Sequence, residues 1–86
     1  MLCYNWEGIK PDITLLGKAV SGGVYPVSVI LADDVVMDVL NPGSHGSTYG
    51  GNNMACAVVE AALKVLIDER LSENSDKMGK ILLKEL

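Results

Sequence analysis

Phenylalanine is absent from the 86 residues, and the aromatic side chains are limited to one tryptophan and three tyrosines. A folded chain this short buries only about 60% of the surface that its unfolded form exposes. We therefore expect at most one small domain, with too few large side chains for a self-sufficient core. The 49% of hydrophobic residues still places the chain among globular sequences and away from disordered or fibrous ones.

Positive charge is also scarce. Seven lysines and arginines stand against eleven aspartates and glutamates, and no basic cluster is present, which excludes the electrostatic footprint of a nucleic-acid binder. No apolar run reaches the roughly 18 residues that a membrane span requires. The opening Met1 to Trp6 lacks the regions of a signal peptide. The default expectation is therefore a cytoplasmic protein without membrane or nucleic-acid partners.

Candidate metal ligands are too few and too scattered for a zinc site. Cys3 and Cys56 lie far apart without CxxC spacing, and the single histidine, His45, cannot complete a Cys/His set. Two reduced thiols explain the cysteines most simply. A histidine without partners more often stabilises a loop than binds a ligand, so no role is assigned to His45.

Strand signals come first along the chain. Ile13 to Leu16 is a short apolar run closed by glycine, typical of a strand buried on both faces. The glycines of Ser21 to Tyr25 predict a turn, and Val27 to Leu31 is suited to a second strand of the same sheet. Asp33 or Asp34 is placed to cap a short helix that runs through Leu40.

Two helices are predicted in the second half of the chain. Met54 to Leu71 carries its polar residues on a narrow stripe, at Glu60, Lys64 and Asp68, and is otherwise apolar. Ser72 to Leu86 is predicted as an amphipathic helix. These elements present more apolar surface than they can cover for one another, so the sequence indicates a continuous part of a larger α/β domain.

Between the short helix and the first long helix, Gly43 to Asn53 is rich in glycine and hydroxyl groups and is predicted to be a loop. Its central stretch, Gly46 to Gly51, offers hydroxyls and unhindered backbone amides that suit a phosphate group. An ordinary glycine-rich surface turn is the alternative. Tyr25 and Tyr49 are candidates for lining a pocket, or for packing over nearby backbone.

Lys18 directly follows the first predicted strand and precedes the glycine-rich turn. A lysine held there has a rigid backbone and limited access to bulk water. Partial desolvation favours the neutral amine, which is the form that attacks an aldehyde. The pattern therefore suits a Schiff-base lysine, although a lysine that extends from a strand end into solvent is the alternative.

Two motifs resemble those of a known family. LLGKAVSGGVYPVSVILADD, Leu15 to Asp34, is similar to the cofactor-lysine segment of ornithine aminotransferases, within the class III, fold type I aminotransferases. HGSTYGGN, His45 to Asn52, resembles their second motif, in the same order and about thirty residues on. The similarity covers essentially the whole chain. Ser21 and Tyr49 favour ornithine aminotransferases over acetylornithine and other omega-aminotransferases.

The resemblance implies a fold, a cofactor and a set of site residues. Residues 1–70 would belong to the large domain that binds pyridoxal 5'-phosphate, a mixed sheet flanked by helices. Residues 71–86 would be a helix leading into the C-terminal small domain. Lys18 matches the lysine that binds the cofactor and acts as general base. Ser47 and Thr48 match hydroxyls that reach the cofactor phosphate of the neighbouring subunit, so the active site would be shared across a homodimer.

The implied reaction moves the delta-amino group of ornithine to 2-oxoglutarate, giving glutamate and glutamate semialdehyde, which cyclises to pyrroline-5-carboxylate. The family is mitochondrial in many eukaryotes, so the mitochondrial matrix is the alternative location. Asn53-Met54 departs from the usual Pro-Leu of the second motif. The family's carboxylate for the pyridine nitrogen and its substrate-binding arginine do not occur in this stretch.

Two alternative hypotheses, each of a different functional class, remain open. One is an inactive relative that retains the fold as a binding or structural protein. The other is a small phosphate-binding domain that binds an anionic metabolite without chemistry. Cooperative unfolding of the 86 residues alone would favour this second reading, because a part of a large domain should be poorly packed by itself.

The role of Thr48 leads to a testable prediction. Thr48→Val in the cofactor-bound protein should weaken retention of pyridoxal phosphate more than it weakens folding, because it removes a hydroxyl that binds phosphate and keeps the shape of the side chain. Cofactor affinity and thermal unfolding of the two proteins check this. Unchanged cofactor affinity would remove Thr48 from the site.

Overall fold

Two short strands pair antiparallel in the middle of the structure, a computed structural model that describes residues 1–86. Strand β1 is Ile13–Leu16 and strand β2 is Val29–Ala32, with Ile13 opposite Ala32 and Leu16 opposite Val29. Both strands are rich in the β-branched and apolar residues that suit a pleated surface. The two predicted strands are confirmed, although β2 begins two residues later than predicted because β1 offers only four residues for pairing.

The prediction that β1 is buried on both faces is wrong for these 86 residues. Ile13 and Leu15 are 49% and 76% exposed, while Thr14 and Leu16 on the other face are half-buried. The cause is that β1 pairs with a single strand and no layer covers its outer face. An apolar face without a covering layer therefore remains on the sheet.

Three short helical turns accompany the strands: the 3-10 helices η1, Cys3–Asn5, and η2, Lys18–Ser21, and the α-helix α1, Asp34–Met37. Helix α1 ends earlier than predicted, at Met37 instead of Leu40. Asp33 occupies its N-cap position, but no side-chain hydrogen bond caps the helix, so the predicted carboxylate cap is wrong. The Asp33 carboxylate instead lies 3.3 Å from the Lys10 ammonium group, which satisfies it.

The longest element is helix α2, Asn53–Asp68, which confirms the predicted helix but ends before the predicted Leu71, because the left-handed Arg70 interrupts it. Asn52 caps its start: the side-chain oxygen of Asn52 accepts a hydrogen bond from the Ala55 amide at 2.8 Å. The side-chain nitrogen of Asn52 donates to the Tyr49 carbonyl at 2.7 Å. One side chain thus satisfies a free amide of the helix and fixes the end of the preceding loop.

Helix α3, Leu71–Glu85, follows after a break at Arg70. Arg70 has φ 53, a left-handed conformation that a continuous helix cannot contain. Its side chain lies 3.2 Å from the Glu73 carboxylate. A backbone hydrogen bond lowers the pKa of Glu73, and the hydrogen bond from Arg70 lowers this pKa further. These contacts stabilise the first turn of α3, directly after the break at Arg70.

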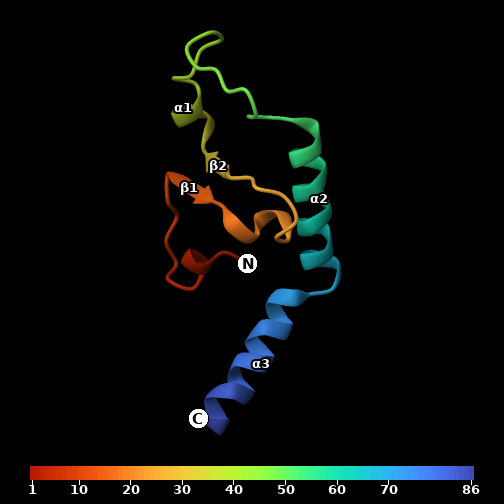
Figure 1. The fold of residues 1–86 in the computed structure, drawn as a ribbon. Helices are drawn as coiled ribbons and strands as arrows, with labels where there is room; N and C mark the ends of the chain where they lie inside the picture. The colour runs from red at the N-terminus through yellow and green to blue at the C-terminus, as the bar shows by residue number, and fades with distance from the viewer.

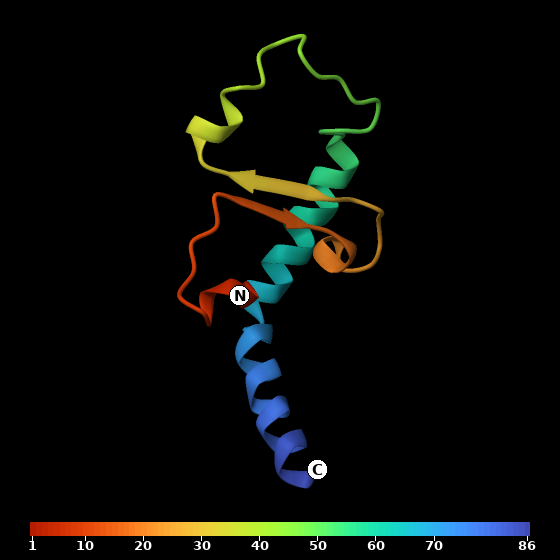
Figure 2. The same ribbon diagram turned by 90° about the vertical axis from the view of Figure 1, so that its left-hand side faces the viewer.

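Helix α3 extends away from the rest of the chain in both views (Figures 1 and 2). The predicted amphipathic pattern is present, but its apolar residues have no partner in the structure. Met78 is 46% exposed and Leu82 is 60% exposed. Neither α2 nor α3 is long and apolar enough to cross a membrane.

Close packing is confined to the contact between η2 and α2, beside the strands (Figure 1). Only Ser21 and Ala55 are buried in the whole chain. The structure exposes 7478 Å², whereas a compact protein of this mass would expose roughly 4,900 Å². Its radius of gyration is 16.3 Å, against about 12 Å for a compact domain of this length. The predicted excess of uncovered apolar surface is confirmed.

This packing predicts the behaviour of the 86 residues expressed alone. They should unfold gradually, without a cooperative thermal transition. A core of two buried residues has too few packing contacts for all of them to be lost in a single step. Calorimetry, together with circular dichroism at several wavelengths, checks this. A single sharp transition with coincident curves would contradict it and would revive the reading of a small independent domain.

The double role of Asn52 predicts a local effect. Asn52→Ala should speed hydrogen exchange at the Ala55 amide by about fivefold, the factor expected for loss of a cap worth ~1 kcal/mol. Exchange should be measured in the full-length protein. Asn53→Ala is the matched control, because no hydrogen bond involves its side chain. Equal exchange in the two variants would show that Asn52 does not cap α2.

Candidate functional site

Lys18 lies where the sequence predicts, directly after β1 and at the first position of η2. Its φ is 55, and Arg70 is the only other residue besides glycine with positive φ. A side chain in this left-handed region costs energy and persists only where the surrounding structure enforces it. The preceding Gly17 is extended. The chain therefore changes direction abruptly at Lys18, which presents its side chain at the strand end.

The expected desolvation of Lys18 is not observed. The residue is exposed, because none of the elements formed by residues 1–86 packs over it. This corrects the expectation of limited access to water within this stretch of chain. The exposed amine is instead open to an approaching molecule.

The turn after Lys18 has the backbone that its glycines allow. Gly22 and Gly23 have φ 67 and 80, so the predicted turn is confirmed. A Cβ at Gly22 would lie 3.5 Å from the Cβ of Ala62, so the turn approaches α2 closely. Glycine supplies both the left-handed conformation and the close approach. The turn that carries Lys18 is thus seated on α2.

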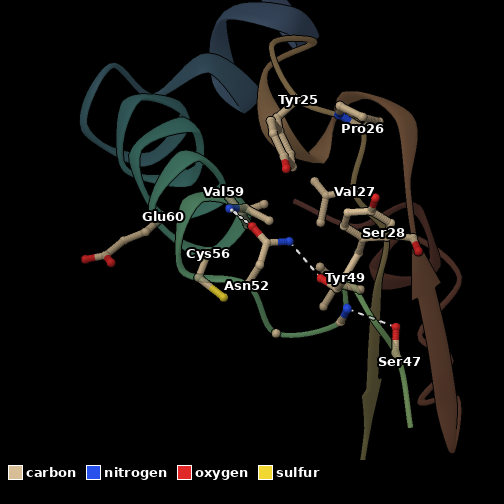
Figure 3. A pocket seen from close by; sticks show the side chains of 14 residues that line it. Tyr25, Pro26, Val27, Ser28, Ser47, Tyr49, Asn52, Cys56, Val59 and Glu60 are labelled. Atoms are coloured by element: carbon tan, nitrogen blue, oxygen red, sulfur yellow. Dashed lines mark hydrogen bonds between the residues drawn. The ribbon is translucent and has the colours of Figure 1, made fainter.

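One pocket has a volume of about 840 Å³, within the range of small-molecule sites. It lies between the segment Tyr25–Val29, the loop that precedes α2, and the first turns of α2 (Figure 3). The residues that line it are Tyr25, Pro26, Val27, Ser28, Val29, Ser47, Tyr49, Gly50, Gly51, Asn52, Ala55, Cys56, Val59 and Glu60. Both tyrosines that the sequence suggested for a pocket are among them.

The loop from Gly43 to Asn52 contains no helix or strand, as predicted. Within it the Ser47 hydroxyl accepts a hydrogen bond from the Gly50 amide at 2.9 Å (Figure 3). Gly51 has φ 70, a conformation that favours glycine. The loop thus has a defined turn at Ser47, and the capping contacts of Asn52 fix its end.

The structure brings only some of the expected site residues together. Ser47 lines the pocket, whereas Lys18 and Thr48 do not. His45 makes no hydrogen bond and lines neither described pocket, and Thr48 is exposed. One chain of 86 residues therefore does not enclose the amine and the hydroxyls in one cavity.

Sequence reasoning did not assign a role to Asn52. Its position immediately before an apolar helix is an N-cap signal that would have been sufficient to find it. The contact of Asn52 with the Tyr49 carbonyl could not be read from the sequence, because it depends on the path of the loop.

Comparison with known proteins gives consistent matches over the whole chain. The family model for class-III aminotransferases matches residues 1–86. The ornithine aminotransferase of Plasmodium falciparum is 60% identical over 86 residues, which are 100% of this chain and 21% of the relative. The mitochondrial ornithine aminotransferase of Rattus norvegicus is 59% identical over 85 residues, 99% of this chain and 19% of the relative.

Solved structures agree with these matches. A structure of the Plasmodium falciparum ornithine delta-aminotransferase is 61% identical, with a TM-score of 0.89, and the match covers 98% of this chain and 21% of that one. The acetylornithine aminotransferase of Elizabethkingia anophelis is 55% identical, with a TM-score of 0.88, over 93% of this chain and 20% of that one.

The chain thus spans about a fifth of the length of the curated relatives that it matches. Its mixed α and β structure, with the two-stranded sheet, is found within aminotransferase structures. A match to the family model over every residue, together with identities near 60%, decides the relationship. This chain belongs to the class-III aminotransferase family.

Proposed function

We propose that this chain is part of an ornithine aminotransferase, which transfers the delta-amino group of L-ornithine to 2-oxoglutarate. The products would be glutamate and glutamate 5-semialdehyde, which cyclises to pyrroline-5-carboxylate. The observation that carries the proposal is the left-handed backbone of Lys18 at the end of β1. Identities of 60% and 59% to two ornithine aminotransferases support the choice of reaction.

In this proposal Lys18 holds pyridoxal 5'-phosphate covalently through its Nζ atom. The strained backbone fixes where the side chain leaves the sheet, and the exposed amine is accessible to an aldehyde. When bound, the cofactor supplies an electron sink. The freed Lys18 amine would then hold and move the proton at the reacting carbon of the substrate.

Ser47 and Thr48 are proposed to bind the cofactor phosphate. The Ser47 oxygen accepts a hydrogen bond from Gly50, so its own O–H group is left to donate to a phosphate oxygen. The amides of Asn53 and Met54, at the start of α2, donate no hydrogen bond within the chain. Hydroxyls, free amides and the positive end of a helix form a donor set that fits a phosphate.

We also propose that the site is shared between the subunits of a homodimer, and the separation of these groups supports this. Ser47 lines the pocket and Lys18 does not, as expected if the hydroxyls serve the cofactor of the neighbouring subunit. The partners of the complete enzyme would then be a second copy of the chain and the small amino acid and oxo acid substrates.

The same proposal extends to domains and location. Residues 1–70 would belong to the large cofactor-binding domain, and 71–86 would lead into the C-terminal small domain. The helix break at Arg70 supports a boundary there. The protein would be cytoplasmic, with the mitochondrial matrix as the alternative, since the rat relative is described as mitochondrial.

A second candidate is transamination of acetylornithine. The similarity to the acetylornithine aminotransferase of Elizabethkingia anophelis favours it, because 55% identity is close to the values for ornithine aminotransferases. Comparing kcat/KM for ornithine and acetylornithine in the full-length protein separates the two. A preference for acetylornithine would overturn the choice of substrate and leave the role of Lys18 intact.

Reductive labelling tests the role of Lys18. Borohydride treatment of the full-length protein with bound pyridoxal phosphate should attach the cofactor to Lys18, as peptide mass mapping would reveal. The other lysines of the chain should stay unlabelled: Lys10, Lys64, Lys77, Lys80 and Lys84. Lys18→Arg should abolish the label, whereas the matched variant Lys10→Arg should retain it. Even labelling of all six lysines would defeat the assignment.

A further inference from the structure

Ser21 is the most deeply buried residue of a chain that buries almost nothing. It is 1% exposed, whereas most large apolar side chains are open to solvent. A buried hydroxyl needs hydrogen-bond partners, because leaving it unpaired is costly. The Ser21 hydroxyl donates to the Tyr25 carbonyl and accepts from the Tyr25 amide at 3.2 Å. Both partners belong to a single residue four positions along the chain.

This pair of hydrogen bonds joins two functional segments. Ser21 is the last residue of η2, the turn that begins with Lys18. Tyr25 is the first residue of the segment Tyr25–Val29, which forms one wall of the pocket (Figure 3). Gly22 and Gly23 lie between them, and glycine restricts the backbone least. The hydroxyl therefore closes a link that the backbone alone would leave loose.

Backbone hydrogen bonds across the same loop are a weak substitute. The Val24 amide donates to the Ser21 carbonyl at 3.4 Å, which is long for such a bond. The Gly22 amide donates to the Ala19 carbonyl at 2.9 Å, but this bond lies within the turn and does not reach the pocket wall. The side chain of Ser21 is thus the main polar connection between the turn and the wall.

Lys18 depends on such a connection because its left-handed backbone is costly. A residue in that region relaxes to an ordinary conformation unless its surroundings prevent it. On one side the turn is anchored by β1, and near Gly22 it rests on Ala62 of α2. Ser21 fixes the remaining end of the turn, against Tyr25.

We propose that Ser21 is a positioning residue for Lys18: its two-way hydrogen bond to Tyr25 holds the lysine turn in fixed register with the pocket wall. This proposal rests on the proposed function of Lys18 as the lysine that binds the cofactor. Ser21 would therefore affect the rate and the extent of the reaction between the Lys18 amine and the cofactor aldehyde. The Ser21 hydroxyl itself would not touch the reacting atoms.

The test uses the full-length protein, freed of cofactor and then mixed with excess pyridoxal phosphate. The growth of the absorbance band of lysine-bound cofactor is followed with time and pH, and borohydride labelling then gives the fraction on Lys18. Ser21→Ala should slow attachment about thirtyfold, the factor expected if the loss of two neutral hydrogen bonds is felt in full. Ser21→Cys keeps nearly the same volume but bonds weakly, and it should slow attachment similarly.

Ser44→Ala is the matched control. The Ser44 hydroxyl also donates to a backbone carbonyl, that of Asn41 at 2.7 Å, but it is exposed and belongs to neither the lysine turn nor the pocket lining. This variant should attach the cofactor at the unaltered rate. The thermal unfolding of each cofactor-free variant is measured beside these rates, so that a general loss of structure is separated from a loss of positioning.

Each outcome decides the proposal. Attachment at the unaltered rate in Ser21→Ala, with Lys18 still labelled, would overturn the positioning role and leave the proposed function in place. Normal attachment in Ser21→Cys alone would show that volume matters and the hydrogen bonds do not, which also overturns it. If Ser21→Ala does not fold, Ser21→Cys decides. No label on Lys18 in the unmodified protein would overturn this proposal together with the proposed function.

Discussion

The seating of η2 on α2 is the contact on which the rest of this structure depends. Ser21 and Ala55, the two buried residues of the chain, belong to these two elements. This contact fixes three parts of the structure relative to α2: the end of β1, the turn that carries Lys18 and the pocket wall. Helix α2 in turn begins at the loop that carries Ser47. The turn that carries Lys18 is thus placed relative to the helix that follows the Ser47 loop by a single small contact.

Much of this arrangement could be read from the sequence. The apolar run Ile13 to Leu16, the glycine-rich turn, the loop before α2 and the two long helices all appear where their patterns predict. These features depend on local chemistry: apolar periodicity and glycine conformations. The two motifs around Lys18 and Ser47 also identified the family that the comparisons show.

What could not be read from the sequence depends on distant partners. Asp33 was expected to cap α1, but its carboxylate is drawn to Lys10, which lies 23 positions away. The burial of β1 and the desolvation of Lys18 both require covering layers that these residues do not form. Ser21 looked like an ordinary turn residue because nothing in its local sequence indicates that Tyr25 folds back over its hydroxyl.

The left-handed Arg70 has a mechanical consequence. Without it, α2 and α3 would run on as one rod of about 50 Å at 1.5 Å per residue. Glycine at this position would adopt the same backbone at less cost, but the joint would then swing freely. Arginine has fewer accessible backbone conformations than glycine, and its side chain also pairs with the Glu73 carboxylate beside the joint. Helix α3 therefore leaves α2 in a new direction, and the chain from Leu71 onward does not prolong the axis of α2.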